Sequence, residues 1–368
     1  MHDVFDYLEW RGDISFSQVP PGDADFAILC LLAYIPFDKV VPQDIMEQPV
    51  CLKEAASRVL GLSVKKKDPV RFHLEDDGKL LEKITQAPRF EELRLTGYVN
   101  KFSEKEEEQF CGMTFIFPDD SLGVVFRGTD GTIIGWKEDF NLGFLEQLPS
   151  QKDAADYLTK TVKSIKTDAG IYVCGHSKGG NLAMYAAAFA GSRIQGRIRA
   201  VRNFDGPGFK DNILESAEFK RISDRILTLM PQSSLVGILL GHKEAYKVVH
   251  STAQARKQHE LYTWAVYRDG FMEESRLSES SMLASKAIGE WVSQMSDDER
   301  MKLTDGIFDI LKDTGAETIE DLKEGHNLLS VVRSLSRLDP ETRALLGQTG
   351  RIISESVWES GVKSKRKI

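Results

Sequence analysis

The chain has 368 residues, 41% of them hydrophobic and 28% charged, and its formal net charge is −8. These fractions are typical of a soluble globular protein and exclude wholesale disorder and a collagen-like structure. The acidic balance, with lysines and arginines scattered along the chain, argues against nucleic acid as the main partner. Because a single core rarely grows beyond about 250–300 residues, we expect one large domain or a domain with an appendage.

The four cysteines lack the spacing of a zinc site or a disulfide framework, so neither is expected. The first 15 residues carry acidic side chains where a signal peptide needs a basic start followed by an apolar run. The longest apolar stretches, residues 26–37 and 234–241, are shorter than the roughly 20 residues that span a bilayer. We therefore expect a cytoplasmic protein.

The first third of the chain changes from helical to strand-like patterns. Residues 26–36 predict a buried helix, and residues 75–84 predict a patterned helix after an acidic stretch. Three strands then follow at residues 94–102, 111–118 and 121–128. The pair Asp119 and Asp120 indicates a hairpin turn between the last two strands.

The middle of the chain alternates helices with short apolar strands. The expected elements are a polar helix near 149–166, a strand at 171–174, a small-residue helix near 179–190, and strands at 197–204 and 225–230. This alternation predicts a mostly parallel sheet covered by helices on both faces. We assign residues 1–272 to this α/β domain, including an N-terminal helical extension.

After about residue 272 the strand pattern stops. Amphipathic helices are predicted at residues 281–295, 297–311, 318–335 and 340–358, with Ser296, Thr318 and Asp339 as helix starts. Residues 273–368 therefore form a predicted helical C-terminal appendage. This appendage could cover a site, bind a partner or pack against the sheet.

The sharpest motif is G-x-S-x-G at residues 175–179, between an apolar strand and an alanine-rich helix. A strand that turns sharply into a helix leaves no room for side chains two residues before and after the serine. Such a turn presents the serine at the edge of the sheet, where the helix N-terminus favours a developing anion. We predict that Ser177 is a nucleophile; the alternative is a glycine-rich turn in which the serine caps the helix.

The motifs around this serine resemble those of the class-3 lipases. Phe126, Arg127, Gly128 and Thr129, followed by Trp136 and Asp139 and then by the serine turn, match the order F-R-G-[ST]…W…D…G-H-S-x-G-G. The similarity covers about residues 90–265, and the chain as a whole resembles a bacterial branch of that α/β-hydrolase group. It implies an α/β-hydrolase fold.

The resemblance also implies an oxyanion hole. The backbone N–H groups of Thr129 and Lys178 are its expected donors, and the Thr129 hydroxyl is a candidate third donor. Trp136 and Asp139 are expected to act as scaffolding beneath the oxyanion loop. Lys178 stands where lipases usually carry an apolar residue, and we expect its ammonium group to reach solvent, where it could attract an anionic substrate.

The general base is sought among seven histidines. His242, His250 and His259 all follow the last predicted strand, as the chain order serine, acid, histidine requires. The stretch at residues 258–264 resembles the lipases' histidine stretch, in which a histidine shortly precedes an aromatic residue. We therefore predict His259 as the base, with His250 and a plain surface role as alternatives.

The acid is where the sequence departs from the class-3 pattern. Those lipases carry an aspartate in the loop after the strand that corresponds to residues 225–230, and here that loop contains Ser234. Asp205 ends the preceding strand instead, which is similar to the acid of the pancreatic-type lipases. We predict Asp205 as the acid; alternatively it caps a turn, and Ser234 or a water orients His259.

The leading interpretation is a serine hydrolase that cleaves a carboxylic ester through an acyl-enzyme on Ser177, without metal or organic cofactor. The expected substrate is a small-molecule or lipid ester, and a lipid substrate would bring peripheral contact with a membrane. The apolar residues 235–240 are expected near the site mouth, as an acyl pocket or lid or as plain core. The alternative function is a weak or inactive hydrolase-fold scaffold that binds or regulates a partner.

Overall fold

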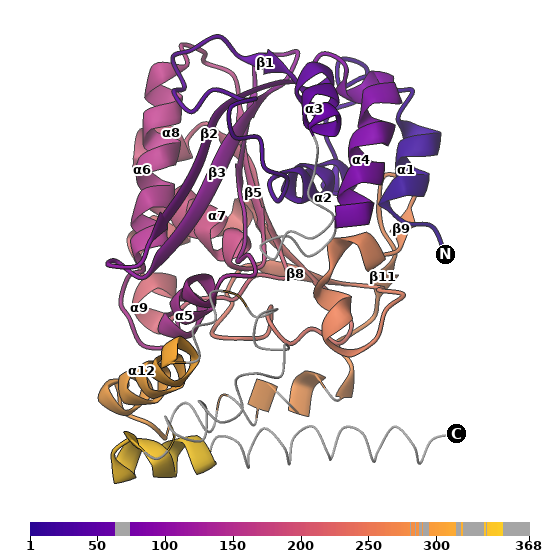
Figure 1. Ribbon diagram of the computed structural model, residues 1–368. Coiled ribbons are helices and arrows are strands. Elements are labelled where there is room, and N and C mark those ends of the chain that lie inside the picture. The colour runs from indigo at the N-terminus through magenta and orange to yellow at the C-terminus, as the bar shows by residue number, and fades with distance from the viewer. Residues whose placement is uncertain are drawn as a thin grey trace.

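Figure 1 shows the protein as a computed structural model. The structure describes residues 1–62, 74–279 and 294–313, together with 281–283, 285–286, 289, 318, 335 and 337–348. Most of the helix predicted at 318–335, and parts of those predicted at 281–295 and 340–358, lie outside the described residues. Within the described part, no helix is long and apolar enough to cross a membrane.

The core of the molecule is a nine-stranded sheet with the order β1-β2-β3-β4-β5-β6-β7-β8-β11. Its strands are β1 (Val50–Cys51), β2 (Arg94–Ser103), β3 (Glu108–Ile116), β4 (Leu122–Phe126), β5 (Ile171–His176), β6 (Ile198–Phe204), β7 (Ile226–Pro231), β8 (Ala245–Val249) and β11 (Glu273–Glu274). From β4 to β8 neighbouring strands are parallel, and at both edges they are antiparallel. The predicted α/β architecture is confirmed, with a mixed sheet whose parallel part carries the motifs.

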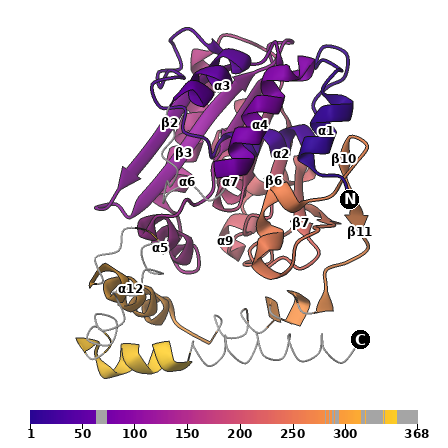
Figure 2. The ribbon, with the colours of Figure 1, turned by 45° about the vertical axis from the view of Figure 1, so that its right-hand side comes forward.

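Helices cover both faces of this sheet (Figures 1 and 2). They are α1 (Val4–Arg11), α2 (Asp23–Leu32), α3 (Leu52–Gly61), α4 (Leu74–Gln86), α5 (Ile133–Asn141), α6 (Pro149–Ser164), α7 (Lys178–Phe189), α8 (Ser192–Gln195), α9 (Asp211–Leu214), α10 (Ala217–Lys220) and α12 (Asp297–Asp313). The helices predicted at 26–36, 75–84, 149–166, 179–190 and 297–311 correspond to α2, α4, α6, α7 and α12.

Strand residues alternate between the two helical layers. Val125 of β4 and Cys174 of β5 face a core built with α1 to α4, whereas Val124 and Val173 face a core built with α6 and α7. Because successive side chains of a strand point to opposite faces, both faces of these strands must be apolar. The N-terminal helices thus form one of the two layers that enclose the sheet.

The predicted hairpin turn joins β3 to β4. The Asp120 N–H donates to the Phe117 carbonyl, and Asp120 adopts a positive φ of 59°. The Asp119 side chain accepts from the backbone N–H of Ser121. Aspartate suits both positions, because it tolerates the left-handed region and bonds to nearby backbone groups.

The strands at the far edge of the sheet were not predicted from the sequence. β8 has three exposed residues followed by two buried ones, and β11 consists of two glutamates. Like β11, the paired strands β9 (Val266–Tyr267) and β10 (Gly270–Phe271) have two residues each. Such strands form because they pair with neighbouring strands, and their own sequences show no apolar alternation that would predict them. β11 lies beyond residue 272, so the expectation that strands stop there is wrong by one short edge strand.

The described part of the C-terminal region packs against α5. Phe308 of α12 contacts Phe140 with 5.6 Å between ring centroids, and Lys137 pairs with Asp305 at 2.8 Å. The predicted helix start at Ser296 is confirmed, because the Ser296 hydroxyl accepts from the Glu299 N–H and the Glu299 carboxylate accepts from the Ser296 N–H.

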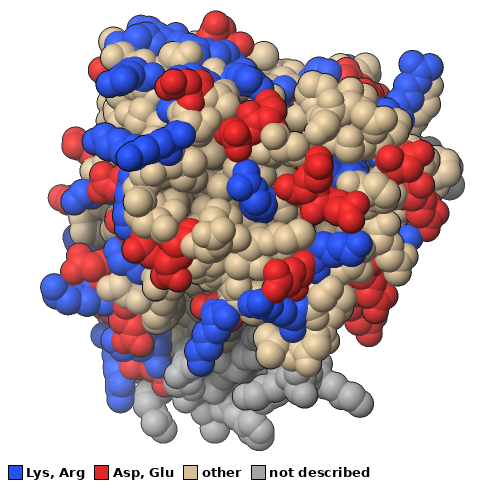
Figure 3. Space-filling view, turned by 90° about the horizontal axis from the view of Figure 1, so that it is seen from above, with Lys and Arg blue, Asp and Glu red and all other residues tan. Residues whose placement is uncertain are grey.

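The predicted start at Asp339 is confirmed in the same way, since its carboxylate accepts from Thr342 N. Figure 3 shows the face of the molecule seen from above, on the side of β1 and α3. On this face Lys and Arg side chains are interspersed with Asp and Glu side chains.

Candidate active site

Ser177 lies at the turn between β5 and α7. Its φ is 58° and its ψ is −134°, a combination that costs a non-glycine residue conformational energy. Two hydrogen bonds hold the turn: Ser177 N donates to Phe204 O at 2.9 Å, and Gly180 N donates to Ser177 O at 2.8 Å. The backbone strain thus belongs to a defined strand-to-helix turn.

The flanking glycines are required by close backbone contacts. A Cβ atom on Gly175 would lie 2.0 Å from the Gly179 carbonyl oxygen, and one on Gly179 would lie 2.1 Å from the Phe126 carbonyl oxygen. Neither contact is compatible with a side chain. The glycines therefore allow the turn, as the motif predicts, and they let β4 approach it.

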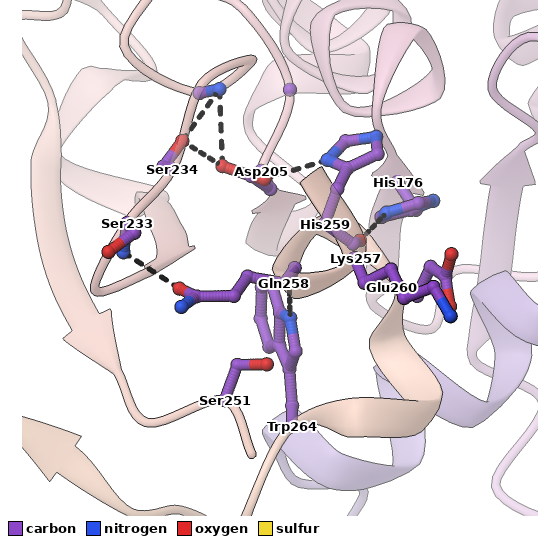
Figure 4. Close-up of polar contacts among 12 residues, drawn as sticks. His176, Asp205, Ser233, Ser234, Ser251, Lys257, Gln258, His259, Glu260 and Trp264 are labelled. Carbon is purple, nitrogen blue, oxygen red and sulfur yellow. Dashed lines mark hydrogen bonds and ion pairs between the residues drawn. The ribbon is translucent and has the colours of Figure 1, made fainter. Parts of the chain in front are cut away.

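The structure brings two of the predicted site residues into contact. His259 Nδ1 lies 2.7 Å from Asp205 Oδ2, and Figure 4 shows the imidazole pointing at the carboxylate. Asp205 follows β6, has a φ of 50° and is fully buried, whereas the His259 side chain is 25% exposed. A carboxylate held on Nδ1 leaves Nε2 of the same ring free to accept a proton.

Ser234 contacts the acid. Its hydroxyl donates to Asp205 Oδ1 at 2.5 Å, and the N–H of Gly237 donates to the same oxygen at 3.1 Å (Figure 4). Hydrogen bonds to an ionised oxygen are stronger than neutral ones, and they compensate for its burial. The residue that replaces the usual lipase aspartate therefore supports the carboxylate at Asp205.

The other two candidate histidines have different partners. His250 Nδ1 lies 2.7 Å from Glu274 Oε1 at the sheet edge, and His242 Nδ1 lies 2.6 Å from Glu244 Oε1. Each histidine is thus paired with a glutamate, and only His259 of the three contacts Asp205.

The segment at residues 126–129, called the oxyanion segment after its predicted role, passes directly beside the serine. A Cβ atom on Gly128 would lie 2.8 Å from Ser177 Cβ. Thr129 follows Gly128, and Lys178 is the first residue of α7, where the backbone N–H has no acceptor within the helix. Lys178 is therefore adjacent to Ser177 in the chain, and Thr129 is one residue from the glycine that contacts Ser177.

The expected third donor is not available in the structure. The Thr129 hydroxyl donates its one proton to Asp139 Oδ2 at 2.6 Å. Asp139 thus contacts the oxyanion segment, whereas the Trp136 side chain is 39% exposed and its expected scaffolding role stays a prediction. Burial raises the pKa of Asp139 to about 6, although Lys178 and the Thr129 hydroxyl favour its charged form.

Residues 84–309, more than half of the chain, match the family model described as Mbeg1-like. The chain belongs to the Mbeg1-like family. This family is lipase-like, and membership supports a hydrolase-type function.

Among solved structures, the chain is similar to the crystal structure of M37 lipase, with 13% sequence identity and a TM-score of 0.37. The match covers 58% of this chain and 68% of that chain. No curated protein shows significant similarity.

In this member of the Mbeg1-like family, the expectation for the Lys178 side chain is wrong. The side chain is 1% exposed, and its ammonium donates to Glu138 Oε2 at 2.6 Å and to Gln109 O at 2.8 Å. Glu138 is fully buried and also accepts from the Ser150 N–H. An ammonium group buried between two helices needs a carboxylate partner, so it cannot attract a substrate anion.

Glu138 was not predicted from the sequence as a residue near the site. It directly precedes Asp139, so α5 supplies one carboxylate to Lys178 and the next to Thr129. Lysine is almost never fully buried without a partner of opposite charge. Its position in the tightly packed serine turn could therefore have indicated a buried acid nearby.

The apolar residues 235–240 form a loop after β7 that is at least partly accessible. Leu235 is 43% exposed and Ile238 is half-buried. The Ser281 hydroxyl donates to the Ser234 carbonyl at 2.6 Å, so the start of the C-terminal region lies against this loop. The loop is therefore not plain core, and it borders the residue that supports Asp205.

Proposed function

We propose that the protein is a serine hydrolase that cleaves a carboxylic ester through an acyl-enzyme on Ser177. The observation that carries the proposal is the 2.7 Å contact between His259 Nδ1 and Asp205 Oδ2 beside a strained serine turn. A serine needs a base to lose its proton, and the base needs a group that orients it. The family supports the hydrolase class but not this particular chemistry.

The mechanism follows from these positions. His259 Nε2 takes the hydroxyl proton while Ser177 Oγ attacks the ester carbonyl carbon, and the carbonyl oxygen becomes an oxyanion. The N–H groups of Thr129 and Lys178 are proposed to stabilise that oxyanion. The C–O bond to the alcohol then breaks, and His259 returns the proton to the departing alcohol.

Water completes the cycle. It loses a proton to His259 as it attacks the acyl-enzyme carbonyl, and the carboxylic acid leaves when Ser177 regains that proton. Asp205 stays ionised and stabilises the His259 imidazolium in both halves. No step needs a metal or an organic cofactor.

A lipid or other apolar ester is the proposed substrate. The support is the accessible apolar loop 235–240, which lies next to the acid's partner Ser234. Peripheral contact with a lipid surface would follow for a lipid substrate.

The test is covalent labelling of the full-length protein with a fluorophosphonate, with mapping of the labelled residue by mass spectrometry. Turnover of p-nitrophenyl esters from acetyl to long acyl chains is measured in parallel. We expect labelling at Ser177 and turnover, and we expect Ser177→Ala to abolish both while the protein remains folded.

Two results would contradict the proposal. One is retained turnover in folded Ser177→Ala. The other is the absence of labelling and turnover in the folded wild type, both with and without detergent or lipid vesicles. The second result would favour a hydrolase-fold scaffold that binds or regulates a partner.

A further inference from the structure

His176 directly precedes Ser177, and its side chain makes contacts that the proposed mechanism does not explain. Its Nε2 lies 2.8 Å from the backbone carbonyl oxygen of His259, and its Nδ1 lies 2.9 Å from the Tyr34 hydroxyl. The two imidazole rings lie 4.5 Å apart between centroids, with 34° between their planes (Figure 4). His176 thus connects the N-terminal helical layer to the loop of the base.

The partners of His176 determine which of its nitrogens carries the proton. A backbone carbonyl oxygen can only accept, so Nε2 must be the donor toward His259. In a neutral imidazole Nδ1 is then an acceptor, and the Tyr34 hydroxyl donates to it. Burial raises the pKa of Tyr34 well above its ordinary value, which keeps the hydroxyl protonated and able to donate.

Tyr34 also lies against the oxyanion segment. A Cβ atom on Gly128 would come within 2.4 Å of the Tyr34 hydroxyl oxygen and within 2.8 Å of Ser177 Cβ. The same glycine therefore contacts the nucleophile and the tyrosine. Tyr34 lies outside residues 84–309, the part that matches the family model.

The base needs a backbone anchor because it lies on a short loop. His259 ends a 3-10 turn, η3 (Ala255–His259), and is followed by extended backbone at Glu260. Asp205 orients its ring, whereas His176 and Trp264 hold the loop backbone, the latter through a 2.7 Å bond to Gln258 O. Of these three residues, His176 is the one next to Ser177 in the chain, so its hydrogen bond links the backbone of His259 to the serine turn.

We propose that His176 is a positioning residue that holds the His259 backbone beside Ser177, with Tyr34 binding Nδ1 and orienting the His176 ring for this bond. The inference rests on the proposed function of Ser177 and His259. It assigns to the N-terminal layer a direct part in the geometry of the active site.

Four variants of the full chain test the inference. His176→Leu removes the donor, His176→Gln keeps an N–H donor near the Nε2 position, and Tyr34→Phe removes the hydroxyl that binds Nδ1. Tyr157→Phe is the matched control, because it deletes another buried tyrosine hydroxyl, which bonds to Gly97 O at 2.8 Å and to Thr114 at 2.9 Å.

We expect kcat for a p-nitrophenyl ester to fall by about 10- to 100-fold in His176→Leu, as for a base displaced by a fraction of an ångström to one ångström. Tyr34→Phe should lower kcat by about 3- to 10-fold, the effect of one lost hydrogen bond. KM should change little, because neither side chain makes a contact proposed for substrate. His176→Gln and Tyr157→Phe should stay close to wild type.

A folded His176→Leu with wild-type kcat would overturn the inference. So would a His176→Gln variant as impaired as His176→Leu, because ring shape and not the donor would then matter.

A second readout does not depend on activity. Nitrogen–proton correlation spectra of the histidine side chains should show His176 as the Nε2–H tautomer in the wild type, and Tyr34→Phe should shift the Nδ1 resonance because that nitrogen loses its hydrogen bond. The Nδ1–H tautomer in the wild type would overturn the inference even if the protein hydrolyses esters. Absent turnover and labelling in the wild type would instead count against the proposed function.

Discussion

Among the described residues, three donate hydrogen bonds to Asp205, and one of them is the proposed base His259. Ser234 and the Gly237 N–H bind the other oxygen of Asp205, which His259 does not touch. Because the carboxylate is fully buried, these donors replace the water that an exposed aspartate would bind. The acid and its supporting serine therefore have different expected contributions to catalysis.

Asp205→Asn should lower kcat by on the order of 10³- to 10⁴-fold, because an amide cannot stabilise the His259 imidazolium and favours the wrong tautomer. Ser234→Ala should lower kcat by only about tenfold, since the Gly237 N–H still supports the carboxylate. Ester turnover of the purified variants measures both. Ser57→Ala, an exposed serine of α3, is the control and should leave kcat unchanged. The reverse ranking of the two site variants would refute Asp205 as the acid.

Asp139 gives the protein a testable dependence of stability on pH. Its pKa rises from 3.8 to about 6 mainly because of burial. Between about pH 4 and pH 6 the folded state keeps this proton while the unfolded chain has released it. The free energy of unfolding contributed by this group therefore falls as pH rises through that window.

Asp139→Asn removes this contribution. The free energy of unfolding of the variant, minus that of the wild type, should therefore increase as pH rises from 4 to 7. Urea titrations at several pH values measure this difference. Asp168→Asn, which changes an exposed aspartate, is the control. A difference between Asp139→Asn and wild type that stays constant across this range would contradict the assignment.

At the scale of elements, α5 is fixed to the serine turn by charge. Glu138 of α5 and Lys178 of α7 form a fully buried ion pair, and β3 adds the carbonyl of Gln109 as a further acceptor. Taking two charges out of water is costly, and removing one partner leaves the other uncompensated. The pair therefore makes the position of the oxyanion segment depend on two helices at once.

Lys178→Met should destabilise the fold by about 3–5 kcal/mol, because Glu138 stays buried without its counter-charge. The double variant Lys178→Met/Glu138→Gln should recover most of that loss in urea unfolding. Arg94→Met breaks the exposed pair with Asp120 and should cost no more than about 1 kcal/mol. Equal losses in the single and double variants would show that packing, and not charge, holds the two helices.

The elements that the sequence predicted are those with a strong local pattern. β5, Ser177 and α7 follow from an apolar run, two glycines that a side chain would prevent, and a small-residue helix. The buried Lys178–Glu138 pair and the edge strands β8 and β11 could not be predicted in this way, because they depend on partners distant in sequence. The Asp205–His259 contact is equally distant, and only the chain order made it a candidate.

At the scale of the whole molecule, the N-terminal residues belong to the hydrolase-type core. Cys30 in α2 and Cys174 in β5 are both fully buried in the same core cluster, and Tyr34 extends from this layer to His176. The apolar composition of residues 26–36 predicted a buried helix. It did not predict which face of the sheet the helix covers, because helical periodicity carries no information on tertiary neighbours. The division at residue 272 stays a prediction, and the described contacts of the C-terminal region include those on α5 and on the loop after β7.

These contacts predict that α12 can loosen without unfolding the sheet. Phe308 is buried and packs edge-to-face on Phe140, which is itself 47% exposed, so the contact lies at the rim of the domain. Phe308→Ala should remove most of the apolar area that α12 buries there, and local opening should become more frequent. Amide hydrogen exchange should accelerate within α12 and stay slow in β5 to β7.

Met301→Ala, which truncates an exposed residue of the same helix, is the matched control and should change neither rate of exchange. Acceleration that spreads equally through the sheet would instead show that α12 unfolds only with the core, and the C-terminal region would then be part of one cooperative unit.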